Sequence, residues 1–518
     1  MAPSVPLPTA ATKTLGVSQS ICSALPSKND WILTKSLMKS LEEFHSFENK
    51  EETEKRVQVL KSLNLIVMKW IQEITDERLP EGMSGGGKLM TFGSYRLGVH
   101  SSGGDIDTVL VAPKHVTRSD FFSTLKDILM ENPNVKNMNA VEKAFVPLMT
   151  FEYSGIEIDL LFAQMNMTTV PENLDLTDDS LLKNLDQESV RSLNGVRVAE
   201  RLFNLVPNQN TFCITLRAIK IWAKNHGIYS NAMGFFGGIS WAILVARTCQ
   251  LYPNATPSKM IQKVFFVFST WKWPSPVILD FLSHERSEMG SLNYLVWGKA
   301  HADKFHFMPI LTPAFPEQNS THNVSISTMS VIQEEMKMAL ETCNQIYKGA
   351  ATWKDLLEEM NFFSKYKHFV AIKMDLEDNK VFEGFLESRL RQLILILERN
   401  GGVKTAQINP KKIQSKWFVG LEFHENVKSL DLTKDIEMFK TSIQNQVVSL
   451  KNVKSTDMDV LYTKRSNLIK ILPAEDLKRG KFYGSTGVKE NAESRKRKCI
   501  DSIAEPEAKR KILGSVNK

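Results

Sequence analysis

Two aspartates, Asp105 and Asp107, stand two residues apart at the start of a strongly strand-forming run, GGDIDTVLVAP. Because side chains two apart on a strand point to the same face, both carboxylates project together while Ile106 points into the core. Two hard oxygen ligands at this spacing suit Mg²⁺, whose octahedral coordination is completed by water and phosphate oxygens. A D-x-D pair is also a common surface feature, so it predicts a metal site only together with its neighbours.

A glycine and a serine, Gly93 and Ser94, form a turn-prone pair before the first aspartate, with ten residues between Ser94 and Asp105. Glycine lets the backbone approach a ligand closely, and the amides and hydroxyl that follow can face phosphate oxygens. The turn and the aspartate pair together predict a site that holds a nucleotide triphosphate on divalent metal ions. The five cysteines show no paired spacing, so the sequence indicates neither a zinc site nor a disulfide framework.

A third carboxylate is expected on a neighbouring strand, and the run GIEIDLLF at residues 155–162 supplies two candidates. Strict alternation places Glu157 and Asp159 on one face of this strand and the aliphatic residues on the other. Either acid could bridge a catalytic metal and accept a proton from an attacking hydroxyl. The pattern does not choose between them, and the other acid is then a solvent-facing strand residue.

A helix predicted over residues 212–224 carries a basic stripe beside its apolar one. The apolar stripe consists of Phe212, Leu216, Ile219 and Ala223, and the basic stripe of Arg217, Lys220 and Lys224. Such a basic face could neutralise a triphosphate, whereas the commoner alternative is a solvated helix face.

The apolar periodicity indicates which elements must position these residues. Helical spacing over residues 31–75 predicts one long amphipathic helix before a Gly-rich break at residues 82–88. Short strands are predicted at residues 88–92, 106–112 and 150–162, with a helical segment at 118–130. Residues 176–350 are rich in helix signals and predict a separate helical domain. From about residue 365 the order strand, helix, strand, strand, helix predicts a small α+β module.

Length and composition indicate a globular protein of two to four domains, with 518 residues that are 42% hydrophobic and 24% charged. The longest apolar run, residues 234–246, falls short of the roughly 20 residues that a membrane span needs, so we expect a buried helix and no membrane contact. The N-terminal segment lacks the pattern of a secretory signal, so we expect the protein to stay inside the cell.

Basic residues are concentrated at the end of the chain. Of the net charge of +7, residues 485–518 contribute nine Lys or Arg against five Asp or Glu, a surplus of +4 that leaves +3 for the rest. Two basic clusters, residues 495–498 and 509–511, have ten residues between them, which predicts a bipartite import signal for an importin carrier and hence the nucleus. The alternative is a solvated basic tail that merely touches RNA.

The stretch FGSYRLGVHSSGGDIDTVLVAPKHV resembles the eukaryotic poly(A) polymerase family, within the nucleotidyltransferases similar to DNA polymerase beta. Further blocks follow in the family's order, among them DDSLLKNLD, RSLNGVRV, LRAIKIWAKNHGIYSNAMGFFGG, MPILTPAFPEQNSTHNVS and FFSKYKHFV. The resemblance implies an α+β multidomain fold: a nucleotidyltransferase palm with a mixed β-sheet, a central helical domain and a C-terminal RNA-recognition-like α+β domain. The corresponding ranges are a flexible extension at 1–28, then 29–165, 166–352 and 353–484, and a basic tail at 485–518.

Carried over residue by residue, the resemblance selects Asp159 over Glu157 and implies that Asp105, Asp107 and Asp159 bind two Mg²⁺ ions, for which Mn²⁺ can substitute. It places the ATP phosphates at Phe92, Gly93, Ser94 and Ser101. Lys220 and Tyr229 match residues that contact the phosphates and the adenine nucleotide. Further nucleotide-side positions are Ile106, Asn194, Gly238, Ile239 and Thr312, and the positions that meet the RNA end are Phe145 and Asn323.

The activity implied by the resemblance is template-independent transfer of AMP from ATP to the 3′-hydroxyl of mRNA, with release of pyrophosphate. The implied partners are the mRNA precursor and proteins of the cleavage and polyadenylation complex, and a monomer is expected. Two alternatives stay open: a terminal uridylyltransferase-type RNA-tailing enzyme, and a catalytically inactive RNA-binding scaffold. The intact carboxylates and Gly-Ser turn disfavour the scaffold. In the C-terminal module, KWFVGLEF resembles the aromatic RNA-stacking signature of RNA-recognition folds only loosely.

Overall fold

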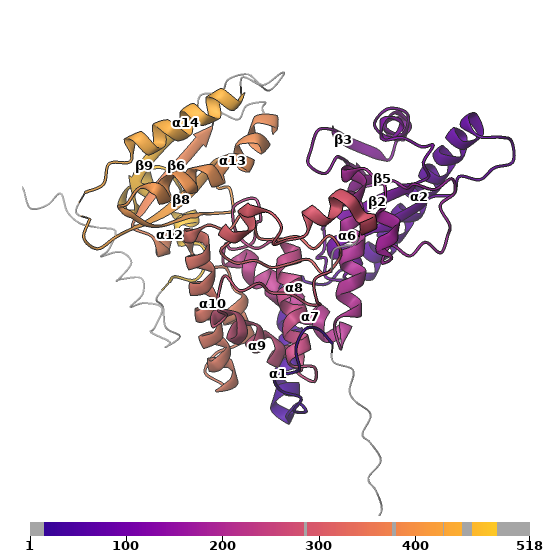
Figure 1. Ribbon diagram of the computed structural model, residues 1–518. Helices are drawn as coiled ribbons and strands as arrows, with labels where there is room; N and C mark the ends of the chain where they lie inside the picture. The colour runs from indigo at the N-terminus through magenta and orange to yellow at the C-terminus, as the bar shows by residue number, and fades with distance from the viewer. Residues whose placement is uncertain (1–14, 284–286, 375–379, 428, 448–457, 484–518) are drawn as a thin grey trace, which may run out of the picture. The chain divides into compact units, whose positions relative to one another are not determined.

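The computed structural model describes residues 15–283, 287–374, 380–427, 429–447 and 458–483 (Figure 1). By packing, the chain divides into unit 1, Met1–Tyr347 with Thr352–Leu357, and unit 2, Lys348–Ala351 with Glu358–Lys518. This division is coarser than the five predicted ranges, which stay predictions. The basic tail with its predicted import signal, and residues 1–14 of the predicted extension, lie outside the described residues.

Two helices, α1 (Lys28–Glu43) and α2 (Lys50–Arg78), stand where the periodicity predicted one. The single long helix is therefore wrong, and the reason is local. His45 takes a positive φ of 51° just after α1, and Asn49 then caps α2 in a reciprocal capping box with Glu52. The helix is interrupted where residues 48–56 contain no apolar side chain, so the apolar spacing stops there too.

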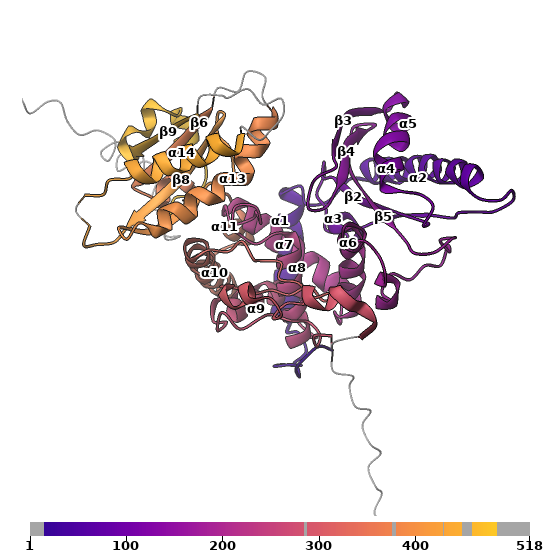
Figure 2. The same ribbon diagram turned by 45° about the horizontal axis from the view of Figure 1, so that its top comes forward.

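A five-stranded mixed sheet forms the core of the N-terminal part of unit 1 (Figure 2). Its strands are β1 (Lys88–Thr91), β2 (Ile106–Ala112), β3 (Val135–Val141), β4 (Leu148–Tyr153) and β5 (Ile156–Gln164), in the order β1-β2-β5-β4-β3. The neighbours β2 and β5 are parallel and the other pairs antiparallel. This confirms the predicted mixed sheet, although the predicted strand at 150–162 is a hairpin that turns at Ser154 and Gly155, both with positive φ.

Alternating residues of β2 and β5 point into two separate cores. Ile106, Leu110, Ile158 and Leu160 pack against α2 and the segments η1 (Phe121–Leu125) and α5 (Lys126–Glu131). The other set, including Val109 and Leu161, packs against α6 (Gln187–Asn204). Asp107 and Asp159 share the parity of this second set, so they project on the α6 side of the sheet.

The rest of unit 1 is helical, as predicted. It contains α7 (Gln209–Asn225), α8 (Gly238–Leu251), α9 (Pro257–Ser269), α10 (Ile326–Tyr347) and α11 (Trp353–Leu357), with short 3₁₀ segments η2 (Asp179–Leu182), η3 (Ser287–Leu295) and η4 (His301–Phe305). The apolar run is the buried helix α8. In the described part of the chain no helix is long and apolar enough to cross a membrane. Part of the predicted N-terminal extension packs against α8. Arg247 donates to Ser18 Oγ (2.6 Å), and the amide of Ile21 donates to Leu251 O (2.9 Å).

Unit 2 has the predicted order of strand, helix, strand, strand and helix. Its elements are β6 (His368–Met374), α13 (Lys380–Arg399), β7 (Val403–Ile408), β8 (Lys416–Phe423), α14 (Thr433–Val447) and β9 (Met458–Lys464), with α12 (Phe362–Lys365), η5 (Arg465–Lys470) and α15 (Ala474–Lys478). The sheet is antiparallel in the order β7-β8-β6-β9, and β9 was not predicted. Trp417 and Phe418 are 1% and 0% exposed, so the aromatic residues of KWFVGLEF that precede Val419 are core residues. They offer no ring for RNA to stack on.

Candidate active site

The three aspartates converge at the junction of β2 and β5. Parallel pairing sets Asp107 directly opposite Asp159, and Asp105 immediately precedes β2. One carboxylate oxygen from each residue lies within 4.8 Å of those of the other two. Asp105 is exposed, whereas Asp107 and Asp159 are half-buried.

The carboxylates raise one another's proton affinity. Burial, followed by the charges of Asp105 and Asp159, raises the pKa of Asp107 to about 7. Burial, Asp105 and Glu157 raise the pKa of Asp159 to about 6. A cation would relieve this repulsion, and a donor set made only of carboxylate oxygens suits a hard divalent ion such as Mg²⁺ or Mn²⁺. The three residues therefore fit the expected metal.

The positions of the two acids on β5 distinguish Glu157 from Asp159, between which the sequence did not choose. Asp159 belongs to the three-carboxylate group, and Glu157 does not. Glu157 lies two residues earlier on β5, opposite Glu152, and it is exposed. The metal-binding role of Asp159 stays a prediction, but its position agrees with it.

The Gly-Ser turn packs directly on Asp107. Gly93 begins the short helix α3 (Gly93–Arg96) at φ +61°, and a Cβ at this position would lie 1.9 Å from Asp107 Oδ2. The amide of Ser94 donates to the Asp107 carboxylate, and the amide of Phe92 donates to the Asp107 carbonyl (3.0 Å). Only glycine combines this backbone conformation with this contact.

Phe92 in turn packs against α6. A Cβ on Gly195 would lie 2.4 Å from the Phe92 ring, so a helical glycine provides the space for it. The preceding residue, Asn194, has a buried side-chain oxygen that accepts no hydrogen bond from the described residues. An acceptor in that state suits a polar ligand, in keeping with the predicted nucleotide-side position.

The charges of Asp105 and Asp107 act on both Lys220 and Tyr229. Burial, Lys224 and Arg217 lower the pKa of Lys220 to about 8, against the opposing effect of Asp105 and Asp107. Burial and the same two aspartates raise the pKa of Tyr229 to about 12, so its hydroxyl stays a donor at neutral pH. A Cβ on Gly238 would lie 2.8 Å from this hydroxyl, which places the first turn of α8 beside Tyr229.

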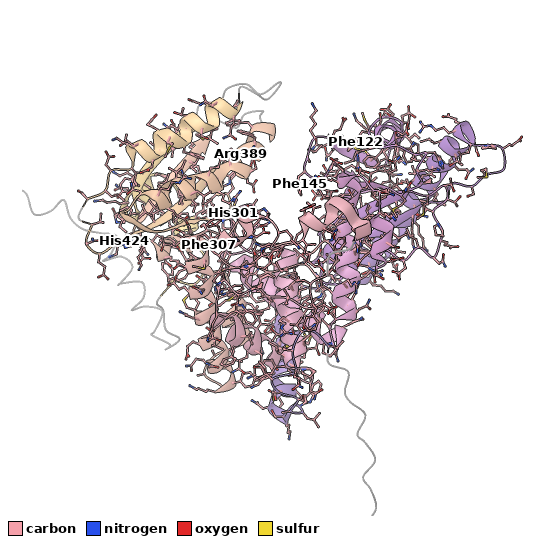
Figure 3. All side chains as sticks on the ribbon, viewed as in Figure 1. Phe122, Phe145, His301, Phe307, Arg389 and His424 are labelled. Carbon is pink, nitrogen blue, oxygen red and sulfur yellow. The ribbon has the colours of Figure 1, made fainter. Side chains whose placement is uncertain are left out.

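The other predicted residues lie in several places. Ser101 is exposed in the loop before Asp105, and Ile239 follows Gly238 in α8. Asn323 Nδ2 donates to Asn231 O (3.1 Å), two residues after Tyr229, and Thr312 exchanges hydrogen bonds with Gln318. Phe145 (Figure 3) is 70% exposed. The guanidinium of Arg191 lies 3.8 Å from its ring centroid. No contact described here joins Thr312 or Phe145 to the aspartates, so these ligand roles stay predictions.

The basic stripe on α7 is only partly a phosphate face. The guanidinium of Arg217 donates to the carbonyls of Ser46, Gly98 and His100, so it anchors backbone, and a phosphate-binding role for it is not supported. The Lys224 ammonium lies 5.3 Å from the Tyr229 ring centroid. Backbone carbonyls have no sequence signature, which is why residue spacing could not reveal the partners of Arg217.

Three family profiles match the chain in succession. The poly(A) polymerase nucleotidyltransferase domain matches residues 16–206, the poly(A) polymerase central domain residues 211–359, and the poly(A) polymerase predicted RNA binding domain residues 361–416. The first match contains all three aspartates and the Gly-Ser turn.

Curated relatives match most of the chain. A poly(A) polymerase of Dictyostelium discoideum is 42% identical over 97% of this chain and 63% of its own length. Poly(A) polymerase PAPalpha of Candida albicans is 40% identical over 83% of this chain and 80% of its own length, and nuclear poly(A) polymerase 1 of Arabidopsis thaliana is 41% identical over 83% and 62%. A solved structure of the Cid1 poly(U) polymerase is 15% identical, with a TM-score of 0.44 over 63% of this chain and 98% of that one. That likeness is too distant to carry an argument.

Proposed function

This chain belongs to the poly(A) polymerase family, and from that premise we propose that it transfers AMP from ATP to the 3′-hydroxyl of RNA without a template. The observation that carries the proposal is the group of three carboxylates within 4.8 Å, closed on one side by the Gly93 turn. The chain spans about 63% of the length of its Dictyostelium relative. Its activity and substrate are therefore proposed and not taken over from that relative.

Different residues of the site have different roles in the proposed transfer. Asp105, Asp107 and Asp159 would hold two divalent ions, which supply Lewis-acid activation of the hydroxyl and charge neutralisation at the phosphates. The turn at Gly93 and Ser94 would lie on the phosphate side, and the Lys220 ammonium, which also donates to Val99 O (2.9 Å), would add positive charge there. We assign Asp159 to take up the 3′-hydroxyl proton.

The transfer step balances without a covalent enzyme intermediate. The RNA 3′-oxygen forms a bond to the α-phosphorus of ATP while the bond from that phosphorus to the pyrophosphate oxygen breaks. The 3′-hydroxyl proton passes to a carboxylate, and pyrophosphate leaves with the electron pair. Positioning and electrostatics therefore account for the catalysis that we propose.

Primer extension tests the proposal against both alternatives. Purified protein is incubated with an oligo(A) primer, Mg²⁺ and one nucleoside triphosphate at a time, with Mn²⁺ in parallel. We expect extension with ATP above all. Preferential extension with UTP would identify a uridylyltransferase-type enzyme, and no extension with any nucleotide would identify an RNA-binding scaffold.

We also propose a nuclear location, with an importin carrier and proteins of the cleavage and polyadenylation complex as partners of a monomer. The support is the name of the Arabidopsis relative and the two basic clusters at 495–498 and 509–511. A fluorescent fusion of the whole chain should collect in nuclei, and alanine in both clusters should leave it in the cytoplasm. A nuclear fusion that lacks both clusters would disprove this import route.

A further inference from the structure

Three side chains on one face of α7 donate hydrogen bonds to four consecutive backbone carbonyls. These carbonyls belong to the loop that leads to Asp105. The loop spans residues 97–104 and joins the Gly93 turn to Asp105. Residues 213, 217 and 220 share a face because they are spaced by four and three along the helix. The bonds run from Cys213 to Leu97 O (3.2 Å), from Arg217 to Gly98 O (2.6 Å) and His100 O (2.6 Å), and from Lys220 to Val99 O (2.9 Å).

A second group of side chains holds the same loop at its other end. Arg56 on α2 donates to Gly104 O (2.6 Å), and Arg56 also pairs with Glu48. Glu48 accepts a further bond from His100 Nε2 (2.9 Å). The Arg56 and Glu48 side chains are each only 4% exposed, so this network is a built part of the unit.

Asp105 depends on this loop more than the other two aspartates do. Asp107 and Asp159 are fixed by the strand pairing of β2 and β5, whereas Asp105 precedes β2 and lies outside that pairing. Its backbone follows Gly104 directly, and the amide of Val99 donates to Ser94 O (2.9 Å) at the other end. A displaced loop would therefore move Asp105 and the Ser94 turn together.

We propose that Arg217 is a positioning residue that fixes the loop at 97–104, and through it Asp105, for catalysis; the inference rests on the proposed function. A guanidinium presents several donors in a rigid planar fork, which matches three carbonyl acceptors at once. A lysine in its place has the charge but not the fork. Because misplacement of a catalytic group by about 1 Å can cost about 100-fold in rate, a loosened loop has a large expected effect.

The first test compares Arg217→Met and Arg217→Lys with a matched control, Arg78→Met. Arg78 also bonds a carbonyl, His115 O (2.6 Å), but from α2 and with Asp120 as its second partner. We expect kcat for primer extension to fall about 100-fold in Arg217→Met and less in Arg217→Lys, with a smaller change in KM for ATP. Arg78→Met should keep the wild-type kcat. Amide hydrogen exchange should accelerate at residues 97–104 in Arg217→Met and stay unchanged in β2.

Chemical rescue separates positioning from a general loss of stability. A hollow of about 430 Å³ is lined by Arg217, Phe47, Tyr95 and Arg96 among others, and we expect a free guanidinium ion to reach this position through it. We expect guanidinium at non-denaturing concentration to restore part of kcat in Arg217→Met and none in an Asp159→Asn enzyme. Unchanged kcat and exchange in Arg217→Met would overturn the inference, as would a loss of kcat with no faster exchange at 97–104. An inactive wild-type enzyme would instead contradict the proposed function.

Discussion

Three acidic side chains held this close carry a cost when no cation joins them. The folded protein raises the pKa of Asp107 to about 7, whereas an unfolded chain leaves an aspartate near 3.8. Between these values the unfolded state gives up its proton first, so the free energy of unfolding falls as pH rises from about 4 to about 7. The site is thus a place where stability is given up for function.

The first prediction follows from the direction of this pH dependence. In metal-free protein kept in EDTA, Asp107→Asn should increase the free energy of unfolding at pH 8 by at least about 1 kcal/mol, since one pKa unit corresponds to about 1.4 kcal/mol. The gain should disappear near pH 4, where the wild-type carboxyl is protonated as well. Urea unfolding at the two pH values measures it, with Asp127→Asn, an exposed aspartate on α5, as the control. A variant less stable than wild type at pH 8 would contradict the repulsion.

The second prediction uses the two acids of β5. Asp159→Asn should reduce primer extension by at least about 1,000-fold, because it removes a charged ligand from the metal group. Glu157→Gln, two residues away on the same face, should keep activity within a few-fold of wild type. Circular dichroism should show both variants folded. An active Asp159→Asn beside an inactive Glu157→Gln would show that the third carboxylate is the wrong one.

Residue types and spacing could predict part of this site. The period of two predicts that Asp105 and Asp107 project together, because that relation is local, although Asp105 itself lies just before β2. The choice between Glu157 and Asp159 depends on which of them lies opposite Asp107, and strand register is a long-range property that the residues of β5 alone do not encode. The carbonyl partners of Arg217 were beyond prediction for a similar reason.

At the level of elements, the Gly93 turn leaves no room for a side chain beside Asp107, and another glycine of positive φ provides a control for its substitution. Gly93→Ala should lose at least about 100-fold in kcat, because its Cβ would lie 1.9 Å from Asp107 Oδ2 and displace the carboxylate. Gly82→Ala is the control, because Gly82 also has a positive φ, +82°, with no atom within 4 Å of the added Cβ, and it lies outside the site and the loop at 97–104. It should show only the backbone strain of about 1–2 kcal/mol in unfolding experiments. Equal loss of activity in both variants would mean that strain, and not the contact, matters at Gly93.

The apolar pattern predicted the buried strand β2, whereas two mostly exposed edge strands carry no such pattern. The strand β2 is almost wholly buried and was found within its observed bounds. The edge strand β3, VKNMNAV, is mostly exposed and contains a register shift, so no apolar alternation marks it. The edge strand β9 was missed likewise, since five of its seven residues are not buried. Between α1 and α2, a capping box begins the second helix within residues 48–56, a stretch without any apolar residue.

On the scale of the whole molecule, the three aspartates lie in unit 1, and the match to the poly(A) polymerase predicted RNA binding domain lies in unit 2. Three aromatic rings of unit 2 lie together. The ring centroids of His368 and Phe423 are 4.5 Å apart, and His368 Nδ1 is hydrogen-bonded to the Tyr462 hydroxyl (2.7 Å). Tyr462 is 43% exposed, and Lys367 and Lys464 lie near enough to affect His368. A partly exposed ring beside two lysines is suited to single-stranded RNA.

We therefore expect Tyr462→Ala to raise KM for the RNA primer about 10-fold, in the range of one lost base–aromatic stack. The kcat at saturating primer should stay unchanged, because unit 1 carries the chemistry. Leu461→Ala is the matched control, being an exposed neighbour on the opposite face of β9. Primer titrations at two salt concentrations measure both effects. Equal KM values for Tyr462→Ala and wild type would exclude this ring from RNA binding.

The chain reaches unit 2 at Lys348, returns to unit 1 for residues 352–357, and leaves again. In that return, Trp353 is buried and donates to Leu33 O (3.0 Å), while Leu357 O accepts from Asn225 (2.7 Å). A fragment cut after Tyr347 would leave an empty slot between α1 and α7, whereas one cut after Leu357 would keep it filled. A gene fragment that encodes unit 1 should therefore end after Leu357, ten residues beyond the end of α10.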